Sequence, residues 1–353
     1  MNGAHVGPYH RKEVAGSHAP APAEPSFDVA HLGHVELLTP KLERSVWYFQ
    51  EVLGMQVVHE HAGSVYLRGY GDHATSSLKL SAAPAAGLGH LAWRASSPAA
   101  LARRAEAIEG AGLGTGWSDG DFGHGRCYRF RDPDGHPMEV YYDETPYRAP
   151  PHLRSALKNQ PMRYPGRGVG VRKTDHVALL CRDVVANRHF AQSLLGLRLR
   201  EQVVFENGRR EIGAWMSANA VHHELAYVVD RRQASGRLHH YSLFVDDKCD
   251  VLRAADILRE HEVFIETGPS KHNNSQAFYI YSYEPGGNRV EIYSSGFFVL
   301  APDFEPVVWD EHSRGTGVYW GAALPDSFLE YATPDVSASA SGEASSKAVV
   351  DVL

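Results

Sequence analysis

The sequence has few cysteines, no long apolar run and no concentration of basic residues. Its three cysteines, Cys127, Cys181 and Cys249, are widely spaced, which excludes a disulfide framework and a C-x-x-C zinc site. No segment approaches the ~18 consecutive apolar residues that a transmembrane helix needs. The formal net charge of −7, without any Lys/Arg run, argues against a nucleic-acid or anionic-membrane partner. We therefore expect a cytoplasmic protein that binds neither nucleic acid nor membrane.

The 353 residues are enough for two domains with cores of their own. A hydrophobic content of 43% and a charged content of 22% are typical of globular proteins. Residues 1–28 lack the apolar centre of a signal peptide and are expected to form a polar extension. The 21 histidines are unusually numerous. Most must be ordinary surface or core residues, so each candidate ligand needs its own argument.

Four segments begin alike, with a histidine followed by a strand-like apolar run. The four histidines are His34, His90, His176 and His240. The first and third segments lead through a helical pattern to a Leu-Gly pair, with 20 positions from histidine to glycine in both. The second and fourth lead through a helical pattern to a strand that carries Glu139 or Glu291, directly after a D/E-P-x-G turn.

This repetition predicts an α+β fold of two domains, each a tandem pair of β-α-β-β-β modules that forms a half-open barrel or funnel. The C-terminal pair is expected to be catalytic and the N-terminal pair non-catalytic. The predicted boundaries are an N-terminal extension over 1–30, the first module pair over 31–145, a Pro/Arg/Gly-rich linker over 146–171, the second module pair over 172–296, a C-terminal lid over 297–334 and a disordered tail over 335–353. A strap between subunits is the alternative role for the lid segment.

His176 and His240 hold the same place in equivalent strands, so the internal symmetry predicts that they lie side by side. Strand alternation puts Glu291 and Tyr293 on one face of the last strand, and sends His239 to the face opposite His240. Two imidazoles and one carboxylate on one side of a metal leave three positions open. That donor set suits non-heme Fe(II), with Mn(II) as the alternative.

The segment from His272 to Glu291, H-N-N-S-Q-A-F-Y-I-Y-S-Y-E-P-G-G-N-R-V-E, resembles a known signature. It is the signature of the type I extradiol ring-cleaving dioxygenases, the catechol 2,3-dioxygenase-like members of the vicinal oxygen chelate superfamily. One departure is Ser270, where the pattern usually has Gly, Asn, Thr, Ile or Val. The resemblance extends over about residues 31–320 and is strongest to homoprotocatechuate and catechol 2,3-dioxygenases.

This resemblance implies roles for further residues. His223, in H-E-L-A-Y, matches the family histidine that takes a proton from the catechol; His222 is the alternative position, and orienting a neighbour is the alternative role. Tyr281 matches the tyrosine that hydrogen-bonds the substrate oxygen. His272 matches the histidine that contacts substrate near the metal. Trp215 falls where the family lines its pocket with an aromatic side chain.

The implied activity is extradiol (meta) cleavage of a catechol by O₂ at a mononuclear Fe(II), in aromatic catabolism, with a muconic semialdehyde-type product and no organic cofactor. The implied partners are the catechol and O₂, and the implied assembly is a homo-oligomer, a tetramer by family resemblance. Homoprotocatechuate enzymes hold the substrate carboxylate with arginines. Here Thr267 stands at one such place, Arg314 is offset from another, and Lys271 is the flanking cation. We therefore predict an uncharged alkyl- or aryl-substituted substrate.

The N-terminal half repeats the ligand pattern in full, with His34, His90 and Glu139. In the family this half usually binds no metal. We expect a vestigial triad, in which core hydrogen bonds hold relic positions; a weak second metal site is the alternative.

Three rival functions share parts of this pattern. A 4-hydroxyphenylpyruvate dioxygenase-like enzyme would need a long C-terminal helix, which the Ser/Ala-rich tail does not suggest. A glyoxalase-like isomerase usually has an extra glutamate ligand in place of a histidine. A non-catalytic small-molecule-binding module would need no metal triad. The spacing from His272 to Tyr281 favours the extradiol enzymes over the first of these rivals.

Overall fold

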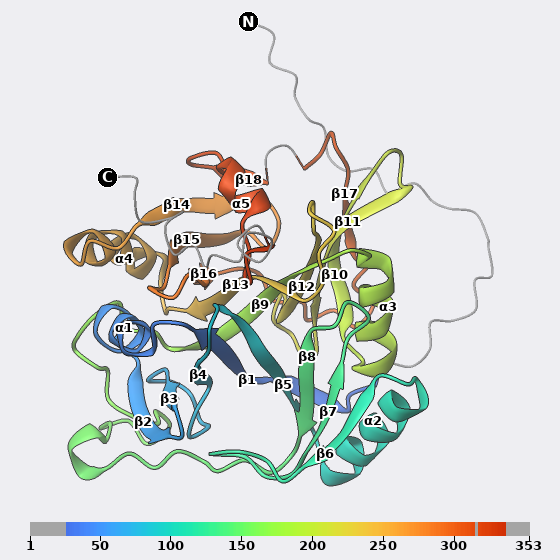
Figure 1. Ribbon diagram of the computed structural model, residues 1–353. Helices are drawn as coiled ribbons and strands as arrows, with labels where there is room; N and C mark the ends of the chain where they lie inside the picture. Colours follow the sequence, from blue (N-terminus) through green and yellow to red (C-terminus); the bar gives the residue numbers. More distant parts are fainter. Residues whose placement is uncertain (1–25, 315–316, 337–353) are drawn as a thin grey trace, which may run out of the picture.

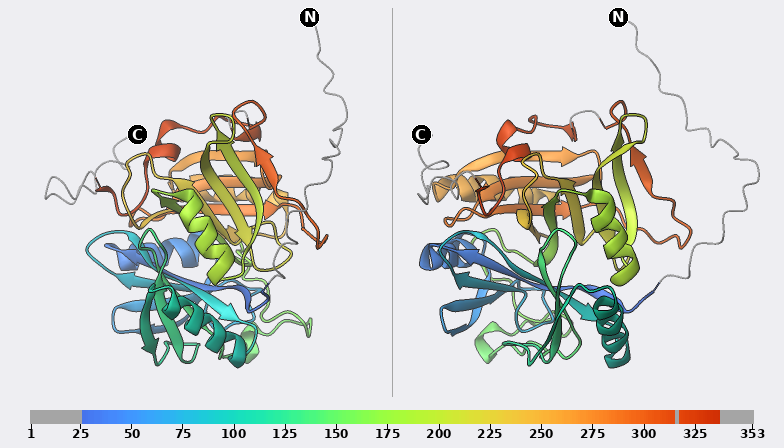
Figure 2. Two further views of the ribbon diagram at one scale, coloured as in Figure 1. Left: turned by 90° about the vertical axis from the view of Figure 1, so that its right-hand side faces the viewer. Right: turned by 45° about the vertical axis from the view of Figure 1, so that its right-hand side comes forward.

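The computed structural model describes residues 26–314 and 317–336, so most of the predicted N-terminal extension and of the predicted tail lies outside the described residues. Two mixed sheets make up the fold (Figure 1). Figure 2 shows the N-terminal sheet, in blue to teal, below the C-terminal sheet, in green to orange. No helix in the described part of the chain is long and apolar enough to cross a membrane.

The N-terminal sheet has eight strands in the order β2-β3-β4-β1-β5-β8-β7-β6. Its strands are β1 (Val29–Thr39), β2 (Gln56–His61), β3 (Ser64–Arg68), β4 (Leu78–Ala82), β5 (Gly87–Ala95), β6 (Gly114–Ser118), β7 (Cys127–Arg131) and β8 (Pro137–Tyr141). Its helices are α1 (Leu42–Trp47), which continues as η1 (Tyr48–Val52), and α2 (Pro98–Gly110). A short turn, η2 (Pro151–Leu153), lies in the connection to the second sheet.

The C-terminal sheet has ten strands in the order β17-β10-β11-β12-β9-β13-β16-β15-β14-β18. Its strands are β9 (Lys173–Cys181), β10 (Arg198–Phe205), β11 (Arg210–Ser217), β12 (Leu225–Val229), β13 (Arg237–Phe244), β14 (Ile265–His272), β15 (Ala277–Tyr283), β16 (Arg289–Ser295), β17 (Val307–Trp309) and β18 (Val318–Trp320). Its helices are α3 (Val184–Leu194), α4 (Lys248–Glu260) and α5 (Asp326–Glu330). Helix α3 packs on β11 and β12, and α4 packs on β14 to β16.

Each sheet contains the β-α-β-β-β unit twice. Strand β1 pairs antiparallel with β5 and parallel with β4, and β9 pairs in the same way with β13 and β12. The backbone N–H of Val35 donates to the carbonyl of Ser77, and that of Val177 donates to the carbonyl of Glu224, both at 3.1 Å. The predicted α+β class and tandem repeat are therefore confirmed, and neither sheet closes into a barrel within the described residues.

Local sequence explains where the helices begin. The Ser97 side chain accepts from the backbone N–H of Ala100 at the start of α2. Asp247 and Asp250 form a capping box at the start of α4. One continuous apolar core joins the two halves of the molecule, with Val35 and Ile292 both fully buried in it. The exact domain boundaries therefore stay a prediction.

Candidate metal centre and pocket

Three neighbouring strands of the C-terminal sheet bring His176, His240 and Glu291 together. The Nε2 atoms of the two histidines lie 3.1 Å apart. Glu291 Oε2 lies 3.0 Å from Nε2 of His176 and 3.5 Å from Nε2 of His240. The register produces this arrangement, because Ser242 of β13 pairs with His176 of β9 on one side and with Glu291 of β16 on the other. The two histidines that symmetry predicted to lie side by side therefore do so, and Glu291 shares their wall.

The chemistry of this cluster fits a divalent cation. Glu291 is completely buried, and its Oε2 lies 3.0 Å from Nε2 of His176 but has no partner with full hydrogen-bond geometry in the described structure. Burial alone would raise the pKa of Glu291, but the imidazoles of His176 and His272 outweigh it and hold the pKa well below its usual range. Burial lowers the pKa of His240 well below its ordinary value. Glu291 and His240 therefore have the protonation states that a metal requires. Burial alone would lower the pKa of His176, but Asp175 and Glu291 outweigh it and raise that pKa to about 9, so a metal bound at its Nε2 would replace a proton there.

Each candidate histidine ligand is oriented by a neighbour that the sequence analysis did not identify. Nδ1 of His176 donates to Oδ2 of Asp175 at 2.9 Å, which leaves its Nε2 facing Glu291. Nδ1 of His240 lies 2.6 Å from Nδ1 of His239, whose Nε2 meets the carbonyl oxygen of Phe328 at 2.7 Å. Asp175 and His239 each directly precede the histidine that they contact. This position in the sequence was the signal that could have identified them.

The prediction that His239 lies on the face opposite His240 is wrong. Both side chains line the same pocket. The register of β13 against β9 shifts between Leu238 and His240, so the strand carries an irregularity at this point. A bulge breaks strict alternation and lets adjacent residues approach one side.

His223 lies against His176, with ring centroids 3.9 Å apart, and lines the pocket. Burial, followed by the nearby His176 and His222, lowers the pKa of His223 well below its ordinary value. His222 does not line this pocket; its Nε2 lies 3.2 Å from Oε1 of Glu201. Nδ1 of His222 lies 2.7 Å from Nδ1 of His223. The geometry thus favours His223 over His222 as the residue that meets substrate.

Tyr281 and His272 complete the polar side of the pocket. Tyr281 pairs directly with Glu291 across β15 and β16. Nε2 of His272 lies 3.2 Å from the Tyr281 hydroxyl and 3.3 Å from Oε1 of Glu291. Burial and then Glu291 raise the pKa of Tyr281 well above its usual value, so the phenol keeps its proton. Trp215 lines the pocket from β11 as the resemblance implied.

Most of the remaining pocket wall is apolar, and the pocket encloses about 1090 Å³ including its mouth. The apolar lining residues include Ala178, Leu180, Val203, Phe205, Ile212, Ala226, Val228, Leu324, Phe328 and Leu329. The last three come from the segment predicted to form a lid. The ring of Phe328 lies 4.8 Å from that of Tyr281, so α5 covers one side of the pocket. Arg314 also lines the pocket, which its offset position in the sequence did not indicate.

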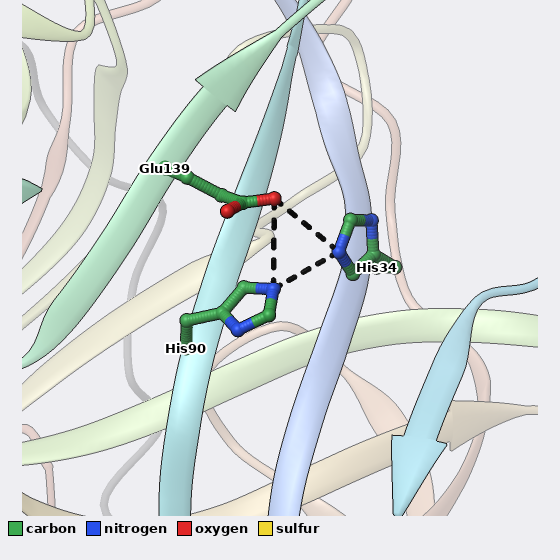
Figure 3. Close-up of side chains that lie close together, drawn as sticks. All are labelled: His34, His90 and Glu139. Atoms are coloured by element: carbon green, nitrogen blue, oxygen red, sulfur yellow. Dashed lines mark hydrogen bonds and ion pairs between the residues drawn. The ribbon is translucent and has the colours of Figure 1, made fainter. Parts of the chain in front are cut away.

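The N-terminal sheet gathers the other predicted triad in the same way (Figure 3). The Nε2 atoms of His34 and His90 lie 3.0 Å apart, and each lies 3.6 Å from Oε1 of Glu139. The three residues come from β1, β5 and β8, the strands equivalent to β9, β13 and β16.

Comparison with known proteins agrees with this geometry. Residues 31–140 and 173–292 match the Glyoxalase/Bleomycin resistance protein/Dioxygenase superfamily. Metapyrocatechase from Geobacillus stearothermophilus is 44% identical over 314 residues, which cover 88% of this chain and 95% of that protein. The manganese-dependent 2,3-dihydroxybiphenyl 1,2-dioxygenase from Geobacillus genomosp. 3 is 37% identical, over 83% of this chain and 94% of its own.

Solved structures are similar over most of the chain. Homoprotocatechuate 2,3-dioxygenase from Brevibacterium fuscum, in complex with 3,4-dihydroxyphenylacetate, aligns with a TM-score of 0.78 at 26% identity, covering 89% of this chain and 95% of its own. These relatives favour the extradiol prediction over its rivals. The chain belongs to the Glyoxalase/Bleomycin resistance protein/Dioxygenase superfamily and, within it, to the extradiol ring-cleaving dioxygenases.

Proposed function

We propose that this enzyme cleaves the ring of uncharged, alkyl- or aryl-substituted catechols at the carbon–carbon bond next to the two hydroxyl-bearing carbons. The proposed metal is Fe(II), held by His176, His240 and Glu291. The observation that carries the proposal is a triad of metal-binding donors on one wall of an otherwise mostly apolar pocket. Mn(II) is the alternative ion, because the same donor set accepts it and one relative is named as manganese-dependent. Metal analysis of protein expressed with each ion, joined to specific activity, distinguishes the two.

The ion would supply chelation of the diol, a lowered hydroxyl pKa and a path for electrons between the substrate and O₂. The chain's own residues then have separate tasks. His223 is neutral at pH 7 because its pKa is lowered, so it can accept a proton from the substrate hydroxyl. Tyr281 keeps its proton and can donate to a substrate oxygen that gains negative charge. The apolar wall receives the ring substituent and excludes water from the reacting carbon.

Replacing Tyr281 by phenylalanine is expected to lower kcat by ~10²- to 10³-fold, the usual effect of removing one donor aimed at developing negative charge. Metal content should not change, because Tyr281 is not one of the proposed ligands. The matched control is Tyr279→Phe. Tyr279 lies two residues earlier on β15, does not line the pocket, and its hydroxyl has no hydrogen-bond partner within the described structure. Equal losses in both variants would contradict the role given to Tyr281.

A substrate panel tests the proposed substrate class. We expect kcat/KM for 3-methylcatechol and 2,3-dihydroxybiphenyl to exceed that for 3,4-dihydroxyphenylacetate by at least ~10-fold, about 1.4 kcal/mol. The reason is that an apolar wall offers no polar partner, so the free-energy cost of removing a carboxylate from water is not offset. Arg314→Ala should leave turnover of the two uncharged catechols unchanged. Faster turnover of the carboxylated catechol, lost in Arg314→Ala, would show that Arg314 binds a substrate anion and would overturn this assignment.

Two further expectations stay predictions. The resemblance implies a homotetramer, which light scattering of the purified protein would measure. The cytoplasmic location predicted from the cysteine content awaits fractionation of expressing cells.

A further inference from the structure

We propose that His34, His90 and Glu139 form a second, non-catalytic site for a divalent transition-metal ion in the N-terminal sheet. Their donor atoms converge from three adjacent strands (Figure 3), with separations of 3.0, 3.6 and 3.6 Å. An ion with ligands at ~2.0–2.2 Å in tetrahedral geometry separates its ligand atoms by ~3.3–3.6 Å. The corresponding separations in the C-terminal triad are 3.1, 3.0 and 3.5 Å.

Hydrogen bonds within the core do not account for this cluster. A separation of 3.6 Å between a histidine nitrogen and Oε1 of Glu139 is too long for a hydrogen bond. One imidazole can donate to the other, but Oε1 then still has no partner within the described structure, although Glu139 is only 1% exposed. His124 adds a second unpartnered atom, since its buried Nε2 lies 3.4 Å from the same oxygen. A cation would satisfy these groups together.

Glu36 orients one candidate ligand toward the site. Nδ1 of His90 donates to Oε2 of Glu36 at 2.8 Å, which leaves Nε2 of His90 free to face Glu139. A carboxylate behind the ligating histidine is the usual support of a metal site. Asp175 plays the same part behind His176 in the C-terminal sheet. The N-terminal triad therefore has its own orienting carboxylate, Glu36, at a position that is not equivalent to Asp175.

The space that holds substrate in the C-terminal sheet is filled in the N-terminal sheet. Ala178 and Ala226 are cross-strand partners on β9 and β12, and both line the substrate pocket. At the equivalent places on β1 and β4 stand Glu36 and Lys79, whose charged atoms lie 3.2 Å apart. Nζ of Lys79 also lies 2.6 Å from Oδ2 of Asp121. This ion pair occupies the side on which a catechol would lie.

The groups assigned to proton transfer are also replaced. Two residues before β12 stands His223, whereas the same position before β4 is Ser76. Tyr281 pairs with Glu291 across β15 and β16, whereas Arg129 pairs with Glu139 across β7 and β8. An ion bound here therefore stabilises the contact between strands and does not cleave rings. Two imidazoles and one carboxylate favour Zn²⁺, Mn²⁺ or Fe²⁺ over Ca²⁺.

Metal stoichiometry on the intact chain tests the proposal. Chelator-treated protein is dialysed to equilibrium against Zn²⁺ or, separately, Mn²⁺, and bound metal is measured by elemental analysis. We expect two ions per chain in the wild type, one in His240→Ala and one in the double variant His34→Ala/His90→Ala. The triple variant, which combines these three substitutions, should bind none. Glu36→Gln should weaken the second site by ~10- to 100-fold, because a supporting carboxylate is lost.

Three controls make the result specific. The double variant His59→Ala/His61→Ala also removes two histidines from the N-terminal sheet, from β2, and should still bind two ions. Glu139→Gln keeps the size of the side chain and should bind one ion. The His34→Ala/His90→Ala variant should keep its kcat/KM for catechol, since neither residue lines the substrate pocket. One ion in the wild type together with none in a folded His240→Ala protein would overturn the second site while leaving the first intact.

Discussion

Replacing His240 by alanine is expected to lower kcat/KM for a catechol by at least ~10³-fold. The variant loses one of three donors that lie within 4.8 Å of one another. Without that donor the C-terminal sheet should release its ion, and an ion of this kind supplies several kcal/mol of charge stabilisation in the transition state. Each 1.36 kcal/mol corresponds to a factor of ten in rate. Steady-state oxygen consumption, measured with saturating Fe(II), gives the ratio to the wild type.

His90→Ala is the matched control for that loss. It makes the same substitution at the repeat-equivalent strand position, since His90 pairs with Glu36 as His240 pairs with Ala178. Ring cleavage should be unaffected, because the pocket lies in the other sheet. A His240→Ala enzyme that keeps its C-terminal ion and turns over catechol within tenfold of the wild type would contradict the ligand assignment.

The repeat is what made the fold predictable. His34 and His176 are followed by the same apolar run and reach Leu-Gly after the same distance, and the structure places both on central strands with the same partners. Equivalent strands in a tandem repeat must bury equivalent faces, so the convergence of His176, His240 and Glu291 follows from the sequence alone. The assignment of Glu291 to the face of Tyr293 likewise needed only strand alternation.

The parts that the sequence did not reveal depend on irregular backbone or on contacts between distant segments. The bulge beside His240 places His239 in the pocket, and no pattern in the sequence predicts this bulge. Glu201 contacts His222, which lies 21 positions later in the sequence. Glu201 also accepts a hydrogen bond from Nε1 of Trp309 at 2.8 Å. Arg314 reaches the pocket from a loop whose path no periodicity describes. Such contacts are set by tertiary packing, which local sequence does not encode.

The ion pair between Glu36 and Lys79 shows a further limit of sequence reasoning. Glu36 and Lys79 are 43 positions apart in the sequence and each reads as an ordinary strand residue. Only the β1–β4 register shows that together they replace the Ala178 and Ala226 pair. The same triad of candidate ligands therefore lies beside a pocket in one sheet and beside an ion pair in the other.

Replacing His223 by asparagine is expected to lower kcat by ~10²- to 10⁴-fold, the usual effect of removing a general base. The neutral imidazole of His223 lies in the pocket against His176, where it can take a proton from the bound diol. Metal content should remain that of the wild type, because His223 is not one of the proposed ligands. Stopped-flow measurement of product formation gives the rate, and elemental analysis gives the metal content.

Two comparisons separate a base from a merely structural histidine. His222→Asn removes the adjacent buried imidazole, which does not line the pocket, and should cost at most ~10-fold, in line with about 1 kcal/mol for a lost hydrogen bond. A nitro-substituted catechol is already ionised near pH 7, so it needs no base for its first proton. The His223→Asn defect should therefore be smaller with this substrate than with catechol itself. An equal defect with both substrates would mean that His223 acts at another step or only supports the ring of His176.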